Sequence, residues 1–131
     1  FICDHGAKGH IDEDLAQLFR RVLFNILVGN RDDHLRNHGF IREPSGWRLS
    51  PAFDINPNTA KQTHALAIDS KNTEPAIRVA MDQAGLYRLD QKAAQSLLDE
   101  VRNAIADWRT EARKLQLTAV EVQRMESVIQ A

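Results

Sequence analysis

The sequence predicts a mainly α-helical fold with one short β-hairpin. Apolar residues recur at spacings of three and four between residues 12 and 29 and again from residue 74 onward, which is the periodicity of amphipathic helices. A turn-forming segment near residue 45 lies between two apolar pairs. The length of 131 residues, with 43% hydrophobic and 27% charged residues, fits a single soluble globular domain over residues 1–131.

The first long helix is predicted over residues 12–29. Its apolar stripe consists of Leu15, Leu18, Phe19, Val22, Leu23, Ile26 and Leu27. Polar residues such as Arg21 and Asn25 fall on other faces of this helix. Asp12 is expected to cap its start, and Gly29 is expected to close its end.

A short hairpin is predicted next, because residues 40–41 and 47–49 flank the sequence REPSG, in which Pro, Ser and Gly favour a turn. Residues 50–73 contain Pro51 and Pro57 and show little periodicity, so this segment is predicted to be mostly ordered loop.

The remainder is predicted to be helical. Pro75 suits a first helical position and Gly85 suits a stop, which frames a helix of about ten residues. A second helix is expected from residue 90 to about residue 114. Thr118 and Glu121 have the spacing of a capping box and are expected to begin the last helix.

Charge and cysteine content limit the classes of function. Seventeen basic and eighteen acidic side chains give a net charge of −1, so no overall field attracts nucleic acid or an anionic membrane. Cys3 is the single cysteine, which excludes an intrachain disulfide and any zinc site that needs two thiolates from this chain. No apolar run reaches the roughly 20 residues that span a bilayer. The expected location is therefore the cytoplasm, with no membrane partner.

The loop GNRDDHLRNHGF, residues 29–40, carries the strongest chemical signal. Asp32 and Asn37 are five positions apart, and Asp54 follows beyond a hairpin that returns the chain toward its start, so the three residues can converge. One carboxylate that accepts a proton from a hydroxyl, with an amide and a second carboxylate that hold Mg²⁺, can perform phosphoryl transfer from ATP. D-x-x-x-x-N is also the spacing of protein-kinase catalytic loops.

A longer pattern is more specific than this spacing. FNILVGNRDDHLRNHGF, followed by WRLSPAFDINP and then HALAID, resembles the C-terminal lobe of HipA-like serine/threonine kinases, the toxins of bacterial toxin–antitoxin pairs. The resemblance covers roughly residues 12–70, about half of the chain. It implies the helical C-lobe of a protein-kinase-like fold, with the hairpin carrying the catalytic and metal-binding loops.

The resemblance assigns roles by position. The catalytic base, the motif histidine and two Mg²⁺ ligands fall on Asp32, His34, Asn37 and Asp54. Arg36 replaces the family lysine, which keeps a positive charge near the phosphates but changes reach and hydrogen-bond geometry. Asp33 falls at a variable position, and an exchange of roles with Asp32 stays open.

The ATP-binding lobe of such a kinase is expected to lie outside these residues. The six glycines form no G-x-G-x-x-G, and none of the five lysines lies in an apolar strand pattern. Because the chain begins FICDHGAKGH, we expect either a fragment of a longer kinase or a natural short homologue, inactive by itself. ATP and Mg²⁺ are the expected co-substrate and cofactor of the full-length protein.

The resemblance also implies partners. They are a protein substrate, such as an aminoacyl-tRNA synthetase, and a helix-turn-helix antitoxin through which DNA would be contacted only indirectly. Two other classes of function stay open. One is a metal-dependent hydrolase that uses Asp32, Asp33, His34 and His38. The other is a kinase-like module that binds an antitoxin or a scaffold without catalysis.

Overall fold

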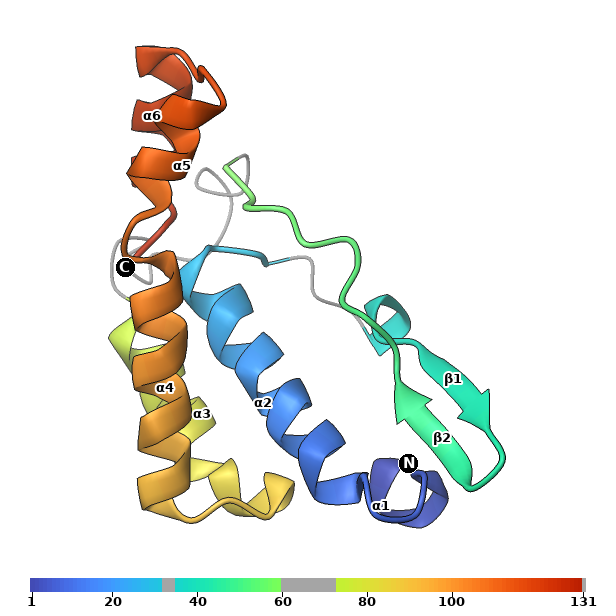
Figure 1. Ribbon diagram of the computed structural model, residues 1–131. Helices are drawn as coiled ribbons and strands as arrows, with labels where there is room; N and C mark the ends of the chain where they lie inside the picture. Colours follow the sequence, from blue (N-terminus) through green and yellow to red (C-terminus); the bar gives the residue numbers. More distant parts are fainter. Residues whose placement is uncertain (32–34, 60–72, 131) are drawn as a thin grey trace.

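The computed structural model describes residues 1–31, 35–59 and 73–130 (Figure 1). It is mainly helical with one two-stranded sheet, as the sequence predicts. The elements in chain order are α1 (Ile2–His5), α2 (Ile11–Leu27), the 3-10 helix η1 (Leu35–Asn37), β1 (Phe40–Glu43), β2 (Gly46–Leu49), α3 (Glu74–Asp82), the 3-10 helix η3 (Ala84–Tyr87), α4 (Gln91–Ile105), α5 (Trp108–Lys114) and α6 (Ala119–Glu126). Across the described residues, no helix has both the length and the apolar character needed to cross a bilayer.

Helix α2 is the central element (Figure 1). The hairpin and α1 lie on one side of it, and α3 and α4 lie on the other. The fully buried side chains of Phe19, Leu23 and Leu27 point toward the second side and form the core with residues of α3, η3 and α4. Hydrophobic burial on this face therefore provides most of the driving force for folding.

The hairpin forms where the sequence predicts it and is slightly longer. Its strands are antiparallel, with Phe40 opposite Leu49 and Glu43 opposite Gly46. The segment after α1 packs against β2, and the backbone N–H of Ala7 donates to the carbonyl of Trp47 at 2.8 Å. A Cβ at Gly46 would lie 2.7 Å from the carbonyl oxygen of Gly6, so only glycine allows this close approach.

An ion pair joins the hairpin to α2. Arg48 of β2 donates from Nε to Oδ2 of Asp14 at 3.0 Å and from Nη2 to Oδ1 at 3.1 Å. The backbone N–H of Leu49 donates to the same carboxylate at 3.0 Å, and Asp14 is only 4% exposed. Burial alone raises the pKa of Asp14, but the hydrogen bonds from Arg48 and Leu49 and the charge of Arg48 hold it below its ordinary value.

Two predicted helix boundaries are wrong. Asp12 does not cap α2: His10 holds that position, and Asp12 lies in the first turn, where its carboxylate pairs with Arg88 at 3.1 Å. Gly85 does not stop α3, which ends at Asp82, because a 3-10 turn continues the chain and brings the buried Ala84 into the core.

The single helix predicted for residues 90–114 is two helices, α4 and α5. Asp107 lies at the break, with non-helical backbone angles, and its carboxylate accepts a hydrogen bond from the hydroxyl of Thr110 at 2.6 Å. Short polar side chains such as Asp form local bonds of this kind at helix starts, which compete with continuation of a helix. The predicted capping box of Thr118 and Glu121 is confirmed at the start of α6.

We expect Asp14→Ala to lower the free energy of unfolding by about 2–3 kcal/mol, because it leaves Arg48 and the Leu49 N–H without their buried acceptor. Asp12→Ala is the matched control: its carboxylate is 80% exposed, so loss of its pair with Arg88 should cost less than about 1 kcal/mol. Urea denaturation of both variants measures the difference. Equal losses would contradict a structural role for the buried pair.

The lowered pKa of Asp14 predicts a defined acid dependence of stability. A carboxyl whose pKa is lower in the folded state contributes stability above its unfolded pKa, near pH 4, and loses that contribution as the pH falls through the folded pKa. The isosteric Asp14→Asn variant should therefore lose less stability than the unsubstituted chain between about pH 4 and pH 2. Thermal unfolding at several pH values measures this; parallel curves would exclude the linkage.

Candidate functional site

The end of α2 fixes the start of the polar loop. Gly29 has a φ of +69°, and its N–H donates to the carbonyl of Ile26 at 3.3 Å, while the N–H of Asn30 donates to that of Asn25 at 2.9 Å. These bonds form a Schellman motif, as predicted for Gly29. In addition, the side-chain amide of Asn30 donates to Oδ1 of Asn25 at 3.1 Å, and both residues are buried. The chain therefore enters the loop in a defined direction.

Residues near the end of the described chain support this turn. The N–H of Gln130 donates to the carbonyl of Leu27 at 2.7 Å. Val128 lies directly beside Gly29, where an added Cβ would be 3.0 Å from the Val128 Cβ. Gly29 is thus required both for its positive φ and for the close approach of Val128.

The segment after β2 returns to the same place. The guanidinium of Arg21 donates to the carbonyl of Ser50, and the N–H of Ser50 donates to the carbonyl of Gly39 at 2.8 Å. Eight residues farther on, the N–H of Asn58 donates to the carbonyl of Gly29 at 3.0 Å. The segment from residue 50 to residue 58 is therefore held at both ends against α2 and the loop.

The structure brings Asn37 and the segment that carries Asp54 together. Asn37 is half-buried at the end of η1 and lines a small pocket together with Asn25 and Asn30, from the end of α2 and the turn after it, and with Phe53 and Ile55, from the segment after β2.

Asp54 lies between the last two of these pocket residues, Phe53 and Ile55. It is exposed and has a φ of +55°, a conformation that Asp tolerates better than most residues. Its Oδ1 accepts a hydrogen bond from Nδ2 of Asn56 at 3.1 Å. Arg36, in η1, is exposed.

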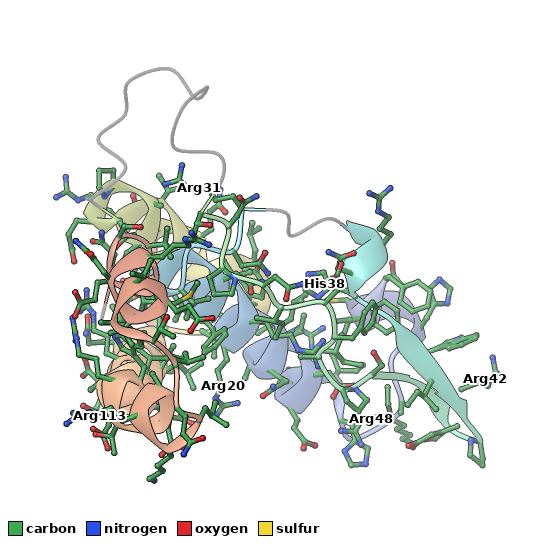
Figure 2. All side chains as sticks on the ribbon, turned by 90° about the horizontal axis from the view of Figure 1, so that it is seen from above. Arg20, Arg31, His38, Arg42, Arg48 and Arg113 are labelled. Carbon is green, nitrogen blue, oxygen red and sulfur yellow. The ribbon has the colours of Figure 1, made fainter. Side chains whose placement is uncertain are left out.

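The other predicted site residues, Asp32 and His34, lie outside the described residues, as does Asp33 of the hydrolase alternative. Arg31 and His38 are labelled in Figure 2 on the two sides of this undescribed segment. Within the described ranges, no group of three His, Cys, Asp or Glu side chains lies close enough to hold a metal ion. His38, the remaining hydrolase candidate, is half-buried and lines the small pocket.

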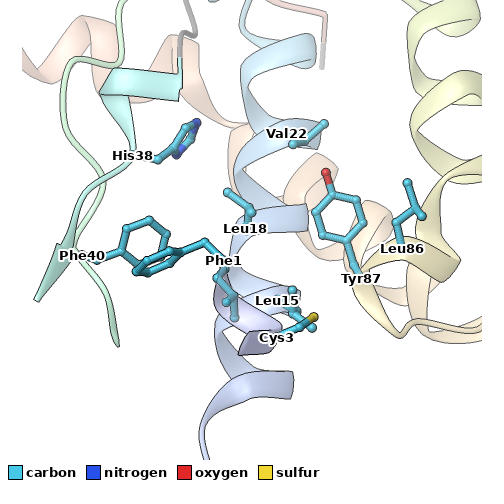
Figure 3. A pocket seen from close by; sticks show the side chains of 10 residues that line it. Phe1, Cys3, Leu15, Leu18, Val22, His38, Phe40, Leu86 and Tyr87 are labelled. Atoms are coloured by element: carbon cyan, nitrogen blue, oxygen red, sulfur yellow. The ribbon is translucent and has the colours of Figure 1, made fainter. Parts of the chain in front are cut away.

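His38 also borders a larger pocket of about 620 Å³ between α1, α2, η3 and β1 (Figure 3). In Figure 3, Phe40 and Phe1 face Tyr87 and Leu86 across the side chains of α2. The described residues that line this pocket include no carboxylate or carboxamide side chain. Apart from His38, Cys3 and Tyr87, the side chains that line this pocket are apolar.

Sequence reasoning missed the residues beneath the site. Asp14, Arg21 and Asn25 were expected neither to be buried nor to contact the loops, yet each is at most 7% exposed. They occupy positions i, i+7 and i+11 of α2, which is one face of a helix. The recurrence of polar residues at positions i, i+7 and i+11 could have indicated a second buried face of this helix. We call these three residues the α2 polar stripe.

Comparisons with known proteins agree with the resemblance. The family model described as HipA-like C-terminal domain matches residues 2–109. A protein named Putative kinase Y4dM, from Sinorhizobium fredii (strain NBRC 101917 / NGR234), is 29% identical over 119 residues. That alignment covers 81% of this chain but only 28% of the relative. No solved structure gives a significant match.

The two glycines Gly29 and Gly85 provide a matched test of the turn at the site. Gly29→Ala should destabilise the chain by about 1–2 kcal/mol, because alanine disfavours a positive φ and its Cβ would press on Val128. Gly85→Ala has no atom within 4 Å of the new Cβ, so it should be neutral or stabilise by up to about 1 kcal/mol. Chemical denaturation compares the two. A neutral Gly29→Ala would show that the turn does not need glycine.

Proposed function

The chain belongs to the family of HipA-like C-terminal domains, and we propose that it provides the catalytic-loop region of a serine/threonine protein kinase. The family match and the kinase name of the relative support the reaction class. In this proposal the chain is the helical C-lobe of a kinase-like fold, and its hairpin separates the catalytic loop from the metal-binding segment.

The observation that carries the proposal is the shared pocket of Asn37 and the residues on both sides of Asp54. Kinase chemistry requires an Asn from the catalytic loop and an Asp from a later segment to meet at one metal site. Their amide and carboxylate oxygens are hard ligands of the kind that Mg²⁺ prefers. Asn37 lines this pocket, and Asp54 is the exposed residue between Phe53 and Ile55, so one amide oxygen and one neighbouring carboxylate would be the donors to the ion.

Each site residue has a role in this proposal. Asp32 would accept the proton of the attacking hydroxyl, and Asn37 and Asp54 would hold the metal. Bound Mg²⁺ would neutralise charge on the ATP phosphates. Arg36 is exposed and offers its positive charge to the phosphates or the substrate. His34 is proposed either to order the loop or to contact the substrate. Asp33 is given no role in the reaction.

The partners are also part of the proposal. Since the chain spans 28% of the length of its curated relative, we place the ATP-binding part of the kinase in sequence outside these residues. The proposed substrate is a protein hydroxyl, for example on an aminoacyl-tRNA synthetase. The proposed regulator is a helix-turn-helix antitoxin, through which the kinase would contact DNA only indirectly. The kinase itself is proposed to act as a toxin in the cytoplasm.

Substitutions in the gene product that contains these residues test the proposal. Asp32→Asn should lower phosphoryl transfer by about 10²–10⁴-fold while leaving ATP affinity nearly unchanged, because an amide cannot accept the proton. Asp54→Ala should instead weaken Mg²⁺-dependent ATP binding, because it removes a metal ligand. Transfer of labelled phosphate and calorimetry with ATP separate the two defects.

Asp33→Asn is the matched control for Asp32→Asn and should retain transfer. If Asp33→Asn abolished transfer and Asp32→Asn did not, the two roles would be exchanged. If neither substitution had an effect, the loop would not be catalytic, and a binding module would be the better description of the chain.

A further inference from the structure

The buried polar side chains of the described residues gather on one side of the fold. They are the α2 polar stripe of Asp14, Arg21 and Asn25, together with Asn30 just beyond the helix. The opposite face of α2 is apolar and packs on α3 and α4. Because burial of a polar group costs free energy unless its hydrogen bonds are made, this arrangement needs a reason other than hydrophobic stability.

Each member of the stripe makes a bond to the part of the chain that carries the proposed site. Asp14 binds the hairpin through Arg48 and Leu49. Arg21 donates to the carbonyl of Ser50, and we call this bond the Ser50 connection. Asn25 accepts from the side chain of Asn30 at 3.1 Å, and we call this bond the Asn30 connection.

The two connections bracket both proposed metal ligands. Asn37 lies between Asn30 and Gly39, and Gly39 in turn accepts from the N–H of Ser50 at 2.8 Å. Asp54 lies between Ser50 and Asn58, whose N–H donates to the carbonyl of Gly29 at 3.0 Å. Each segment is therefore held at both of its ends. The bonds lead, directly or through one backbone hydrogen bond, to Arg21 or to the turn held by Asn25, and these two residues are four positions apart on α2.

Hydrogen bonds suit this task better than apolar contacts do. Apolar side chains of similar volume often stabilise a core to the same extent as a buried polar group does. They do not, however, fix the orientation of the group that they contact. A guanidinium and a carboxamide bind their acceptors in defined geometries and hold functional groups within the small tolerances that a metal site needs.

We propose that Arg21 and the Asn25–Asn30 pair are positioning residues that hold the Asn37 loop and the Asp54 segment in register through α2. This inference rests on the proposed function for the identity of the metal ligands. It assigns to Arg21, Asn25 and Asn30 no contact with substrate or metal.

Amide hydrogen exchange of the 131-residue chain tests each connection separately. Asn30→Ala should speed exchange at the Asn58 N–H by about tenfold, the equivalent of one buried hydrogen bond, and leave Ser50 nearly unchanged. Arg21→Met should speed exchange at the Ser50 N–H and affect Asn58 less. If Arg21→Met does not fold, Arg21→Lys replaces it: the lysine ammonium does not reproduce the geometry of the guanidinium, so exchange at the Ser50 N–H should still be faster, by a smaller factor. The amide of Val101, in α4, reports global unfolding and should change little in either variant.

Two controls separate positioning from general loss of stability. Arg20→Met removes the neighbouring arginine, which pairs with Glu100 across the surface at 3.2 Å, and should change neither amide. Asn25→Ala and the double variant Asn25→Ala/Asn30→Ala should affect Asn58 as much as Asn30→Ala does, because all three remove one shared bond. Additive effects of the two single substitutions would overturn the pairing.

Mn²⁺ can replace Mg²⁺ as a probe, and its binding is measured by electron paramagnetic resonance. This measurement tests whether the positioning residues affect the proposed metal site. Asn30→Ala and Arg21→Met should each raise the Mn²⁺ dissociation constant by about tenfold, while Arg20→Met leaves it unchanged. Equal exchange at Ser50, Asn58 and Val101 in every variant, or unchanged Mn²⁺ affinity in both variants, would overturn the inference. Absence of Mn²⁺ binding to the unsubstituted chain, with the exchange pattern as expected, would overturn the proposed metal site and support the connections.

Discussion

The fold of the site region depends on one buried carboxylate. A two-stranded hairpin is at best marginally stable in water, and β1 and β2 have no further strand to pair with among the described residues. Asp14 anchors the hairpin to α2, because it binds both the Arg48 side chain and the Leu49 backbone, and the Ala7 N–H adds a backbone bond to Trp47. The hairpin separates η1 from the segment after residue 49, so this pair helps to set the position of both loops.

Helix α2 divides two tasks between its faces. Phe19, Leu23 and Leu27 bury apolar surface against α3 and α4, which stabilises the domain but tolerates small shifts between helices. The polar stripe on the other face forms directional bonds to the hairpin and the loops. A helix of this kind can transmit the rigidity of a well-packed core to a small polar site, which sits on backbone that would otherwise have few contacts.

Local patterns in the sequence predicted the elements that are determined locally. The stripe of Leu15, Phe19 and Leu23, the REPSG turn and the Thr118–Glu121 box each act over a few residues, and each is confirmed. The break at Asp107 was missed because apolar periodicity continues across it. Arg21 and Asn25 were missed because a hydrophobic pattern treats every polar residue as solvent-facing. The meeting of Asn37 with the Asp54 segment followed from the returning hairpin, whereas the bond from Arg21 to Ser50 depends on tertiary packing alone.

The contacts of Val128 and Gln130 with the end of α2 have a consequence for the order of events during protein synthesis. The residues of α2, the hairpin and the polar loop leave the ribosome before residues 128–130, so the turn at Gly29 reaches its final packing only when these later residues have emerged. Contacts between positions so far apart in the chain also cost loop-closure entropy, which slows folding. Until residues 128–130 have emerged, the nascent polypeptide therefore carries its polar loop without the contacts that support the turn at Gly29.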